Sequence, residues 1–150
     1  MKYYWKVVAK DSEGNGTSTI RNFTTKLDAA LEWSYATGGN VDSIAVSADG
    51  EYIVAGTGYQ YRLFLFNKDS STPLWTYNAL SDVRSVAISA DGKYITAGSQ
   101  DDKVYLFDKD SSTPLWSYEA GDSVYTTAIS ADGEYIVAGS ADEKVDLFNK

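Results

Sequence analysis

Acidic side chains gather in the variable stretches that separate recurring segments of this sequence. These residues are Asp82, Asp101, Asp102, Asp122, Asp142 and Glu143. Carboxylates in such numbers could attract a cationic partner or hold a weakly bound Ca²⁺ ion, and they could equally cap turns and keep the surface solvated. The stretch closest to a calcium loop, residues 11–16, has Asn22 where the acidic residue at the twelfth position should stand. We therefore expect no metal ligand and no cofactor.

An aromatic and basic cluster marks the first of these variable stretches. Residues 58–62 read Gly-Tyr-Gln-Tyr-Arg and carry one residue more than the matching stretches downstream. Tyrosine and arginine are favoured at protein interfaces. The cluster could instead pack against the N-terminal segment, and loops also vary under weak constraint alone. The candidate partner-binding residues are Tyr59, Gln60, Tyr61, Arg62, Arg84, Asp101, Asp102, Tyr125 and Asp142.

Composition and charge argue against several classes of function. The chain contains no His and no Cys, which removes the usual general base, the imidazole and thiolate metal ligands, and disulfides. Its formal net charge of −8 argues against a nucleic-acid partner, because such binding needs Lys and Arg to displace counterions. The apolar runs are too short to cross a bilayer, so we expect no membrane insertion. The N-terminal stretch lacks the apolar core of a signal peptide, although a longer parent protein could be extracellular or lie at the cell surface.

The elements that position the variable stretches come from a repeat. Near copies occupy residues 41–66, 83–107 and 124–148, and the tryptophans that precede them recur at spacings of 42 and 41 residues. Each copy has an alternating apolar run, an Ala-Asp-Gly turn, a second run, a variable loop and a third run ending in Leu-Phe. Asp-Gly between alternating runs is a strong hairpin signal.

A Trp-x-Tyr stretch precedes each copy and supplies a fourth strand. These stretches are residues 31–36, 74–79 and 115–120. A period near forty residues, built from four short strands, is typical of one blade of a β-propeller. The sequence therefore predicts an all-β chain of β-propeller blades, each of four antiparallel strands, with three blades per chain.

The repeats resemble those of WD-repeat and pyrroloquinoline-quinone-like β-propellers. The residues that carry the resemblance are V-x-S-V-A-I-S-A-D-G-x-Y-I-x-A-G-S, followed by K-V-Y-L-F-D and S-T-P-L-W. The Trp-Asp pair of WD repeats stands here as Phe-Asn or Phe-Asp, and their Gly-His pair has no counterpart. Ser99 with Asp101, and Ser140 with Asp142, match the serine and aspartate of the WD-repeat hydrogen-bond network, whose histidine is missing. The resemblance covers residues 31–150 and implies a propeller fold.

The N-terminal residues resemble the last two strands of a fibronectin type III domain. A Y-x-W-x-V-x-A strand, a polar turn and a strand ending in F-T-T carry this resemblance. An isolated hairpin is marginally stable in water, so it must pack on the repeats or on another chain. We expect a hairpin over 1–25, a linker over 26–30 and three blades over 31–150, the last without its own outer strand.

Three blades cannot close a ring, because propellers typically need about four to eight. The chain begins its repeats with an outer strand and ends them with inner strands, so two chains placed head to tail could exchange outer strands and form a six-bladed ring. The residues expected at this strand-exchange interface are Trp33, Tyr35, Val145, Leu147 and Phe148. The alternative is that the chain is a fragment of a longer propeller.

The expected function is that of a noncatalytic binding or assembly module. It would associate with itself as a dimer and present the variable loops to a protein or glycan partner. A fragment of a larger surface-protein propeller is one alternative, and a fragment of a quinone-dependent enzyme is another. A purely structural, self-associating repeat is a further alternative.

Overall fold

The computed structural model describes residues 30–150, and the regular structure of this part consists of β-strands alone. The predicted fibronectin-like hairpin at 1–25 lies outside the described residues. The strands are β1 (Val41–Val46), β2 (Tyr52–Thr57), β3 (Arg62–Asn67), β4 (Trp75–Asn78), β5 (Val83–Ile88), β6 (Tyr94–Ser99), β7 (Lys103–Asp108), β8 (Trp116–Glu119), β9 (Val124–Ile129), β10 (Tyr135–Ser140) and β11 (Val145–Asn149).

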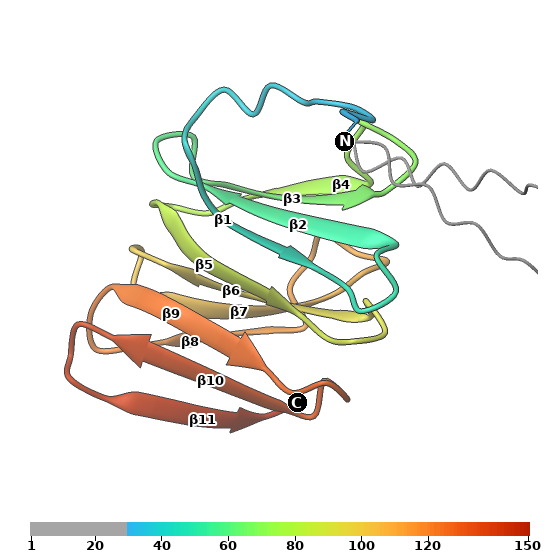
Figure 1. Cartoon of the computed structure of the whole chain (residues 1–150). Helices are drawn as coiled ribbons and strands as arrows, with labels where there is room; N and C mark the ends of the chain where they lie inside the picture. Colours follow the sequence, from blue (N-terminus) through green and yellow to red (C-terminus); the bar gives the residue numbers. More distant parts are fainter. Residues whose placement is uncertain (1–29) are drawn as a thin grey trace, which may run out of the picture. The chain divides into compact units, whose positions relative to one another are not determined.

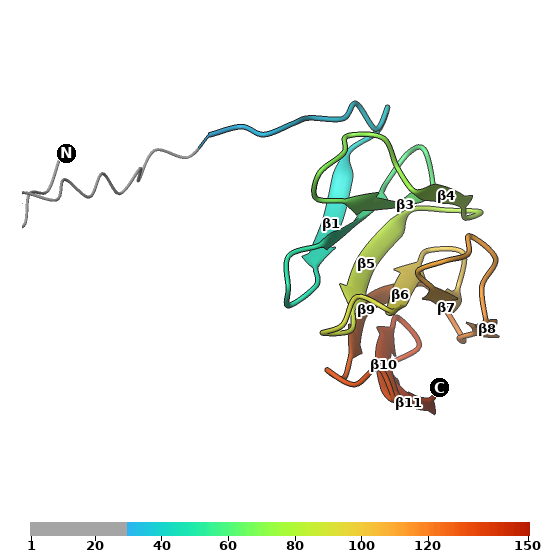
Figure 2. The ribbon, with the colours of Figure 1, turned by 90° about the vertical axis from the view of Figure 1, so that its right-hand side faces the viewer.

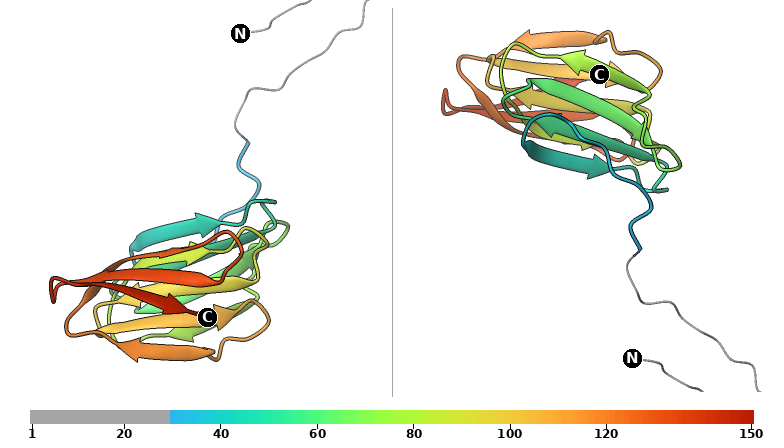
Figure 3. Two further views of the ribbon diagram at one scale, coloured as in Figure 1. Left: turned by 90° about the horizontal axis from the view of Figure 1, so that it is seen from below. Right: turned by 90° about the horizontal axis from the view of Figure 1, so that it is seen from above.

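The strands form three antiparallel sheets, which we call the first, second and third blade. The first blade has the order β1-β2-β3-β4, the second β5-β6-β7-β8 and the third β9-β10-β11. The sheets stack in chain order from the top to the bottom of Figure 1, and Figure 3 views the stack from below and from above. This arrangement confirms the all-β fold with three propeller blades. The third blade has no strand in the position that β4 and β8 occupy in the other two.

Ala-Asp-Gly turns join the first two strands of every blade. In the second blade, Ser89 Oγ donates to Asp91 Oδ1 at 2.6 Å, and the Lys93 amide donates to the same oxygen at 3.0 Å. Gly92 follows with a φ of 72°, a left-handed conformation that a residue with a β-carbon adopts only at a cost. The other two blades repeat the Ser–Asp bond at Asp49 and Asp132. These turns fix the hairpin register in each blade.

Apolar side chains fill the space between neighbouring blades. Leu63 and Leu65 on β3 share a buried cluster with Val83 on β5 of the second blade. Val104 and Leu106 on β7 share the equivalent cluster with residues of the third blade. Figure 2 shows the same blades turned by 90°, with the strands of one facing those of the next. The third strand of a blade therefore points two apolar side chains toward the blade that follows.

Backbone hydrogen bonds also link successive blades at their Ala-Asp-Gly turns. The Ala48 amide donates to the Ala90 carbonyl at 3.0 Å, and the Ala90 amide donates to the Ala131 carbonyl at 2.9 Å. Both bonds run in the same direction along the stack. The blades are thus held in register by polar as well as apolar contacts.

Residues 31–36 were expected to form an outer strand and do not form one in the single chain. No neighbouring strand in the described structure pairs with them. The side chains of Trp33 and Tyr35 nonetheless pack on the first blade, where their ring centroids lie 5.4 and 5.3 Å from that of Phe66. The segment has the packing of an outer strand without its backbone pairing.

The packing of Trp33 repeats that of Trp75, which lies on the outer strand β4. Trp33 Nε1 donates to the Lys68 carbonyl at 2.6 Å, and Trp75 Nε1 donates to the Lys109 carbonyl at 2.7 Å. The Trp75 bond joins the first blade to the second. Trp33 therefore packs on the first blade as the outer-strand tryptophan of a preceding blade would.

Candidate functional site

The variable loops lie together at one end of the blades, and we call this end the loop face. Hydrogen bonds join the loop after the second strand of each blade to the segment before its first strand. The Gly58 amide donates to the Asn40 carbonyl at 3.1 Å, and the Gln100 amide donates to the Asp82 carbonyl at 2.9 Å. The loop face consists of residues 37–40, 58–61, 79–82, 100–102, 120–123 and 141–144.

Two tyrosines of the first-blade loop have a left-handed backbone. The φ angle is 65° at Tyr59 and 57° at Tyr61, a region that residues with bulky side chains rarely adopt. Asp82 holds this loop by accepting a hydrogen bond from the Tyr59 amide at 2.9 Å. The Tyr59 side chain is 78% exposed and that of Tyr61 is 40% exposed. The strained loop keeps two aromatic rings accessible to solvent, with Gln60 between them.

Asp101 is engaged within the loop face. Its Oδ2 accepts hydrogen bonds from the Leu80 amide at 3.0 Å and from the Tyr105 hydroxyl at 2.7 Å. Burial, and then the bond to Asp101, raise the pKa of Tyr105 well above its usual range, so this phenol stays a donor. Asp101 Oδ1 is buried and has no hydrogen-bond partner within residues 30–150. This carboxylate therefore ties two loops together.

Asp142 has a similar structural role in the third blade. It accepts hydrogen bonds from the Ser140 hydroxyl, from the Gly121 amide at 3.2 Å and from Lys144 Nζ at 2.9 Å. The bonds from Lys144 and Ser140 hold the pKa of Asp142 well below its usual range. Like Asp101, it connects the loop after the second strand of its blade to the segment before the first strand.

Arg84 bridges carboxylates across the first two blades. Its guanidinium nitrogens lie 2.9 Å from Asp42 Oδ2 and 2.9 Å from Asp82 Oδ2, and Nη2 donates to Gln100 Oε1 at 3.1 Å. Arg84 Nε is buried and has no partner in the described part of the chain. The guanidinium is thus largely committed to contacts within the fold.

The remaining predicted partner-binding residues occupy different settings. Tyr125 lies near the start of β9 and is 52% exposed. Asp102 has a φ of 67° and lies at the position that Tyr61 holds in the first blade. Arg62 begins β3, where its amide donates to Thr57 Oγ1 at 3.1 Å. The most accessible members of the predicted set are Tyr59, Tyr61 and Tyr125.

Residues 30–150 contain neither a metal-binding cluster nor a membrane-spanning helix. No group of three or more acidic side chains there could hold a metal ion. The same residues include no helix of the length and apolar character needed to span a membrane.

The outward faces of the first and third blades are a second pair of candidate surfaces, one at each end of the stack. Between the blades, β-carbons added to Gly56 and Gly98 would lie 2.7 Å from Cγ1 of Val83 and Val124, so each valine sits directly over a glycine of the preceding blade. Gly139 is the equivalent glycine of the third blade, and no valine of residues 30–150 covers it. The face around Gly139 is open.

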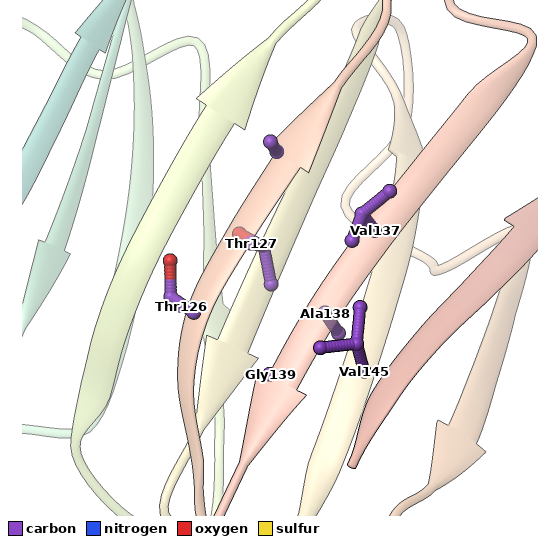
Figure 4. Close-up of a pocket in the computed structure, with 7 residues that line it drawn as sticks. Thr126, Thr127, Val137, Ala138, Gly139 and Val145 are labelled. Atoms are coloured by element: carbon purple, nitrogen blue, oxygen red, sulfur yellow. The ribbon is translucent and has the colours of Figure 1, made fainter.

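A hollow of about 140 Å³ marks this open face of the third blade. It is lined by residues 126–128 of β9, residues 137–139 of β10 and Val145 of β11. Figure 4 shows the Val137 and Val145 side chains standing beside the position of Gly139. The lining is mainly apolar, as expected for a surface that receives another sheet.

The strand-exchange residues do not all lie on this open face. Val145 and Leu147 are 77% and 67% exposed, so both point outward from β11. Phe148 alternates to the other side of the strand, where its ring centroid lies 5.3 Å from that of Trp116 in the same chain. Sequence reasoning missed Val41, which is 49% exposed although its counterparts Val83 and Val124 are buried. The repeat alignment carried this signal, because only Val41 has no preceding blade to cover.

Comparison with known families gives an assignment for the repeats. Two segments match the WD40 family, described as WD domain, G-beta repeat, at residues 71–108 and 112–149. The chain belongs to the WD-repeat family. The quinone-type and fibronectin resemblances have no counterpart among these matches. Comparison with curated proteins found no match.

A solved structure of similar fold supports the architecture. The structure described as that of U3-55K matches with a TM-score of 0.70 at 20% sequence identity. The match covers 76% of this chain and 37% of that one, so this chain spans little more than a third of its neighbour's length. WD-repeat propellers are typically noncatalytic and generally bind protein partners. In this chain, Asp101 accepts a bond from Tyr105, although the histidine of the WD-repeat network is missing.

Proposed function

We propose that this WD-repeat chain is a noncatalytic interaction module that associates with a second copy of itself and presents its loop face to a protein partner. One observation carries the self-association. The outward faces of the first and third blades are repeat equivalents of the two halves of the interfaces already buried inside the chain.

Solvent exposure supports this equivalence on both open faces. On β1, Ile44 is 71% exposed, whereas its counterpart Val86 on β5 is 6% exposed. On β11, Leu147 is 67% exposed, whereas Leu106 on β7 is fully buried. A monomer would leave apolar side chains in water that the same fold buries twice elsewhere, and such surface favours association.

The loop face supports the second half of the proposal. Tyr59 and Tyr61 present exposed aromatic rings on this face. The left-handed backbone at Tyr61 recurs at Asp102 and Glu143, whereas that at Tyr59 is found in the first blade alone among residues 30–150, and strain of this kind points to function more often than an unstrained loop does. Neighbouring exposed Asp122 and Glu143 give the face an acidic character, which favours a partner that carries positive charge. A protein segment rich in Lys or Arg meets both requirements, because guanidinium and ammonium groups also stack on tyrosine rings.

Light scattering coupled to size exclusion, over at least a tenfold dilution series, tests the self-association. The expected result is a mass of twice the 16.4 kDa chain that persists on dilution. A single-chain mass at all concentrations would contradict self-association and would favour a fragment that needs further blades.

Titration with an oligolysine peptide tests the loop face. The Tyr59→Ala, Tyr61→Ala double variant should bind the peptide at least about tenfold more weakly, the loss expected when interface aromatics are truncated. Tyr118→Ala is the matched control, because Tyr118 is 44% exposed on β8 and lies outside both the loop face and the proposed self-association interface. Equal binding by both variants would contradict the assignment, and binding of an uncharged glycan instead would replace the protein partner by a carbohydrate.

A further inference from the structure

The free edge of β11 carries the same pattern of apolar residues as the edges of β3 and β7, which pair with the outer strands β4 and β8. In the first blade, Leu63 and Leu65 on β3 pair with Tyr77 and Trp75 on β4. In the second, Val104 and Leu106 on β7 pair with Tyr118 and Trp116 on β8. In both blades, therefore, two apolar residues separated by one position pair with the tyrosine and the tryptophan of the outer strand, and the register is the same in the two blades. β11 presents Val145 and Leu147 and, among the described strands, pairs with β10 alone.

Within residues 30–150, the Trp-x-Tyr segment at 31–36 has no strand partner, unlike the two at β4 and β8. Trp33 and Tyr35 correspond to the tryptophan and tyrosine of β4 and β8. Both pack on the outward face of the first blade, at the opposite end of the stack from β11. The backbone of this segment is free of any sheet. One chain thus carries an unfilled strand position and, at its other end, the strand that fits it.

We infer that residues 31–36 of a second copy form the fourth strand of the third blade, in a register that pairs Val145 with Tyr35 and Leu147 with Trp33. This inference rests on the self-association proposed above and specifies which strand is exchanged. Trp33 keeps its contacts with Phe66 of its own chain, as Trp75 on β4 keeps its contact with Phe107 of the next blade. The reciprocal exchange closes a ring of six blades from two chains.

The inner strands fit the same junction. Val41 of the second copy takes the place over Gly139 that Val83 takes over Gly56. The amide of Ile44 of the second copy then faces Thr126, as the amide of Val86 faces Ser43 and bonds to its Oγ at 3.0 Å.

The tyrosines beside the Ala-Asp-Gly turns repeat the pattern. A β-carbon on Gly92 would lie 2.5 Å from Tyr52, and one on Gly133 would lie 2.5 Å from Tyr94. Tyr135, the third tyrosine of this set, is 51% exposed and has no following turn to cover. A β-carbon on Gly50 would meet nothing within 4 Å. Tyr135 of one copy and Gly50 of the other are the remaining pair.

Engineered disulfides test this register, because the chain has no native cysteine. In the two complete blades, the residue between the paired apolar positions faces the residue between Trp and Tyr, as Phe64 faces Thr76 and Tyr105 faces Ser117. The equivalent residues are Asp146 and Ser34. Directly opposed residues lie about 5 Å apart, within disulfide reach.

The Ser34→Cys, Asp146→Cys variant should form a covalent dimer with two disulfides when oxidised glutathione accepts the thiol hydrogens. Its intact mass should be four hydrogen atoms below that of two chains. The matched control is Ser34→Cys, Asn149→Cys. Its second cysteine lies three residues along the strand, roughly 10 Å away by strand geometry and out of reach.

The outcomes separate the inference from the proposed function. A scattering mass of two chains without bridging above the control would leave self-association standing and overturn the exchanged strand. Bridging within one chain, or a ladder of covalent multimers, would overturn the closed ring. A monomer at all concentrations would overturn both the exchange and the self-association beneath it.

Discussion

Tyr52 lies over Gly92 so closely that a β-carbon on the glycine would stand 2.5 Å from Tyr52 Cδ2. Gly50 has nearly the same backbone, with φ values of 75° and 72° for the two glycines, yet nothing lies within 4 Å of its added β-carbon. The pair separates the cost of a left-handed conformation from the cost of a contact between blades.

Gly92→Ala should destabilise the chain more than Gly50→Ala does. Both variants carry the left-handed strain of about 1–2 kcal/mol, and Gly92→Ala adds a clash with Tyr52 worth about 1–3 kcal/mol. Urea denaturation at a concentration low enough to keep chains apart measures the difference. At high concentration, Gly50→Ala should weaken self-association, because the proposed ring places Tyr135 of a second copy at that site. Equal losses of stability would mean that the tyrosine simply moves aside.

Ile44→Asp should abolish self-association and leave the single chain folded. Ile44 is 71% exposed in the chain, so a carboxylate there costs little until a second copy covers it, when it becomes a buried unpaired charge. We expect the dissociation constant to rise at least about a hundredfold, which corresponds to about 3 kcal/mol. Sedimentation equilibrium measures the constant.

Val86→Asp provides the control for this substitution. Val86 is the counterpart of Ile44 inside the chain and is 6% exposed, so the same carboxylate should prevent folding. Circular dichroism distinguishes an unfolded chain from a folded monomer. A dimer of Ile44→Asp as tight as that of the unchanged chain would remove β1 from the interface.

Tyr105→Phe should lower the free energy of unfolding by about 1–3 kcal/mol, the cost of leaving a buried acceptor without its donor. Tyr105 is 4% exposed, and its hydroxyl is 2.7 Å from Asp101 Oδ2. Tyr118→Phe is the control, because Tyr118 lies on the outer strand β8 and its side chain is 44% exposed. Chemical denaturation monitored by tryptophan fluorescence gives both values, and matching losses would show that the bond to Asp101 contributes little.

The Ala-Asp-Gly turns should make the fold sensitive to acid. The serine hydroxyls, and then the backbone amides, lower the pKa of Asp49, Asp91 and Asp132 below the ordinary value of 3.8. A carboxyl with a lowered folded-state pKa adds stability that is complete above the unfolded-state pKa. That stability is lost as pH falls through the folded-state value. Unfolding free energies measured by urea denaturation should therefore fall from about pH 4 downward.

Ser89→Ala tests the cause of this acid sensitivity. Removing the hydroxyl should return the pKa of Asp91 toward its ordinary value, because the bond from Ser89 is the largest cause of its shift. The variant should lose less stability between pH 4 and pH 2 than the unchanged chain. An unaltered pH dependence would assign the acid response to other carboxylates.

Much of the fold could be predicted because the repeated residues mark where each strand and each blade begins and ends. Asp-Gly steps between alternating runs determined the hairpins, and the tryptophan spacing determined the blade length. The state of residues 31–36 could not be predicted in the same way. A strand needs a neighbour to accept its hydrogen bonds, and the sequence of one chain does not say which neighbour is present.

The candidate site was harder to predict than the fold. The identity of Tyr59 and Tyr61 indicated an interface, but their left-handed backbone appears only in the structure. Asp101, Asp142 and Arg84 were selected for their charge, yet each is bonded to neighbouring loops. Side-chain type shows that a group can bind, and only geometry shows whether the fold already uses it. The exposure of Val41 and Ile44 was not predicted, because their counterparts in the second blade, Val83 and Val86, are buried core residues.

The amide-to-carbonyl bonds at Ala48, Ala90 and Ala131 give the stack a polarity, much as a filament has a plus end and a minus end. The Ala48 carbonyl stands at one terminus as an acceptor, and the Ala131 amide stands at the other as a donor. Two like termini brought together would oppose donor to donor or acceptor to acceptor. Head-to-tail contact between two copies would therefore extend this series of bonds, whereas contact between two first blades would gain none of them.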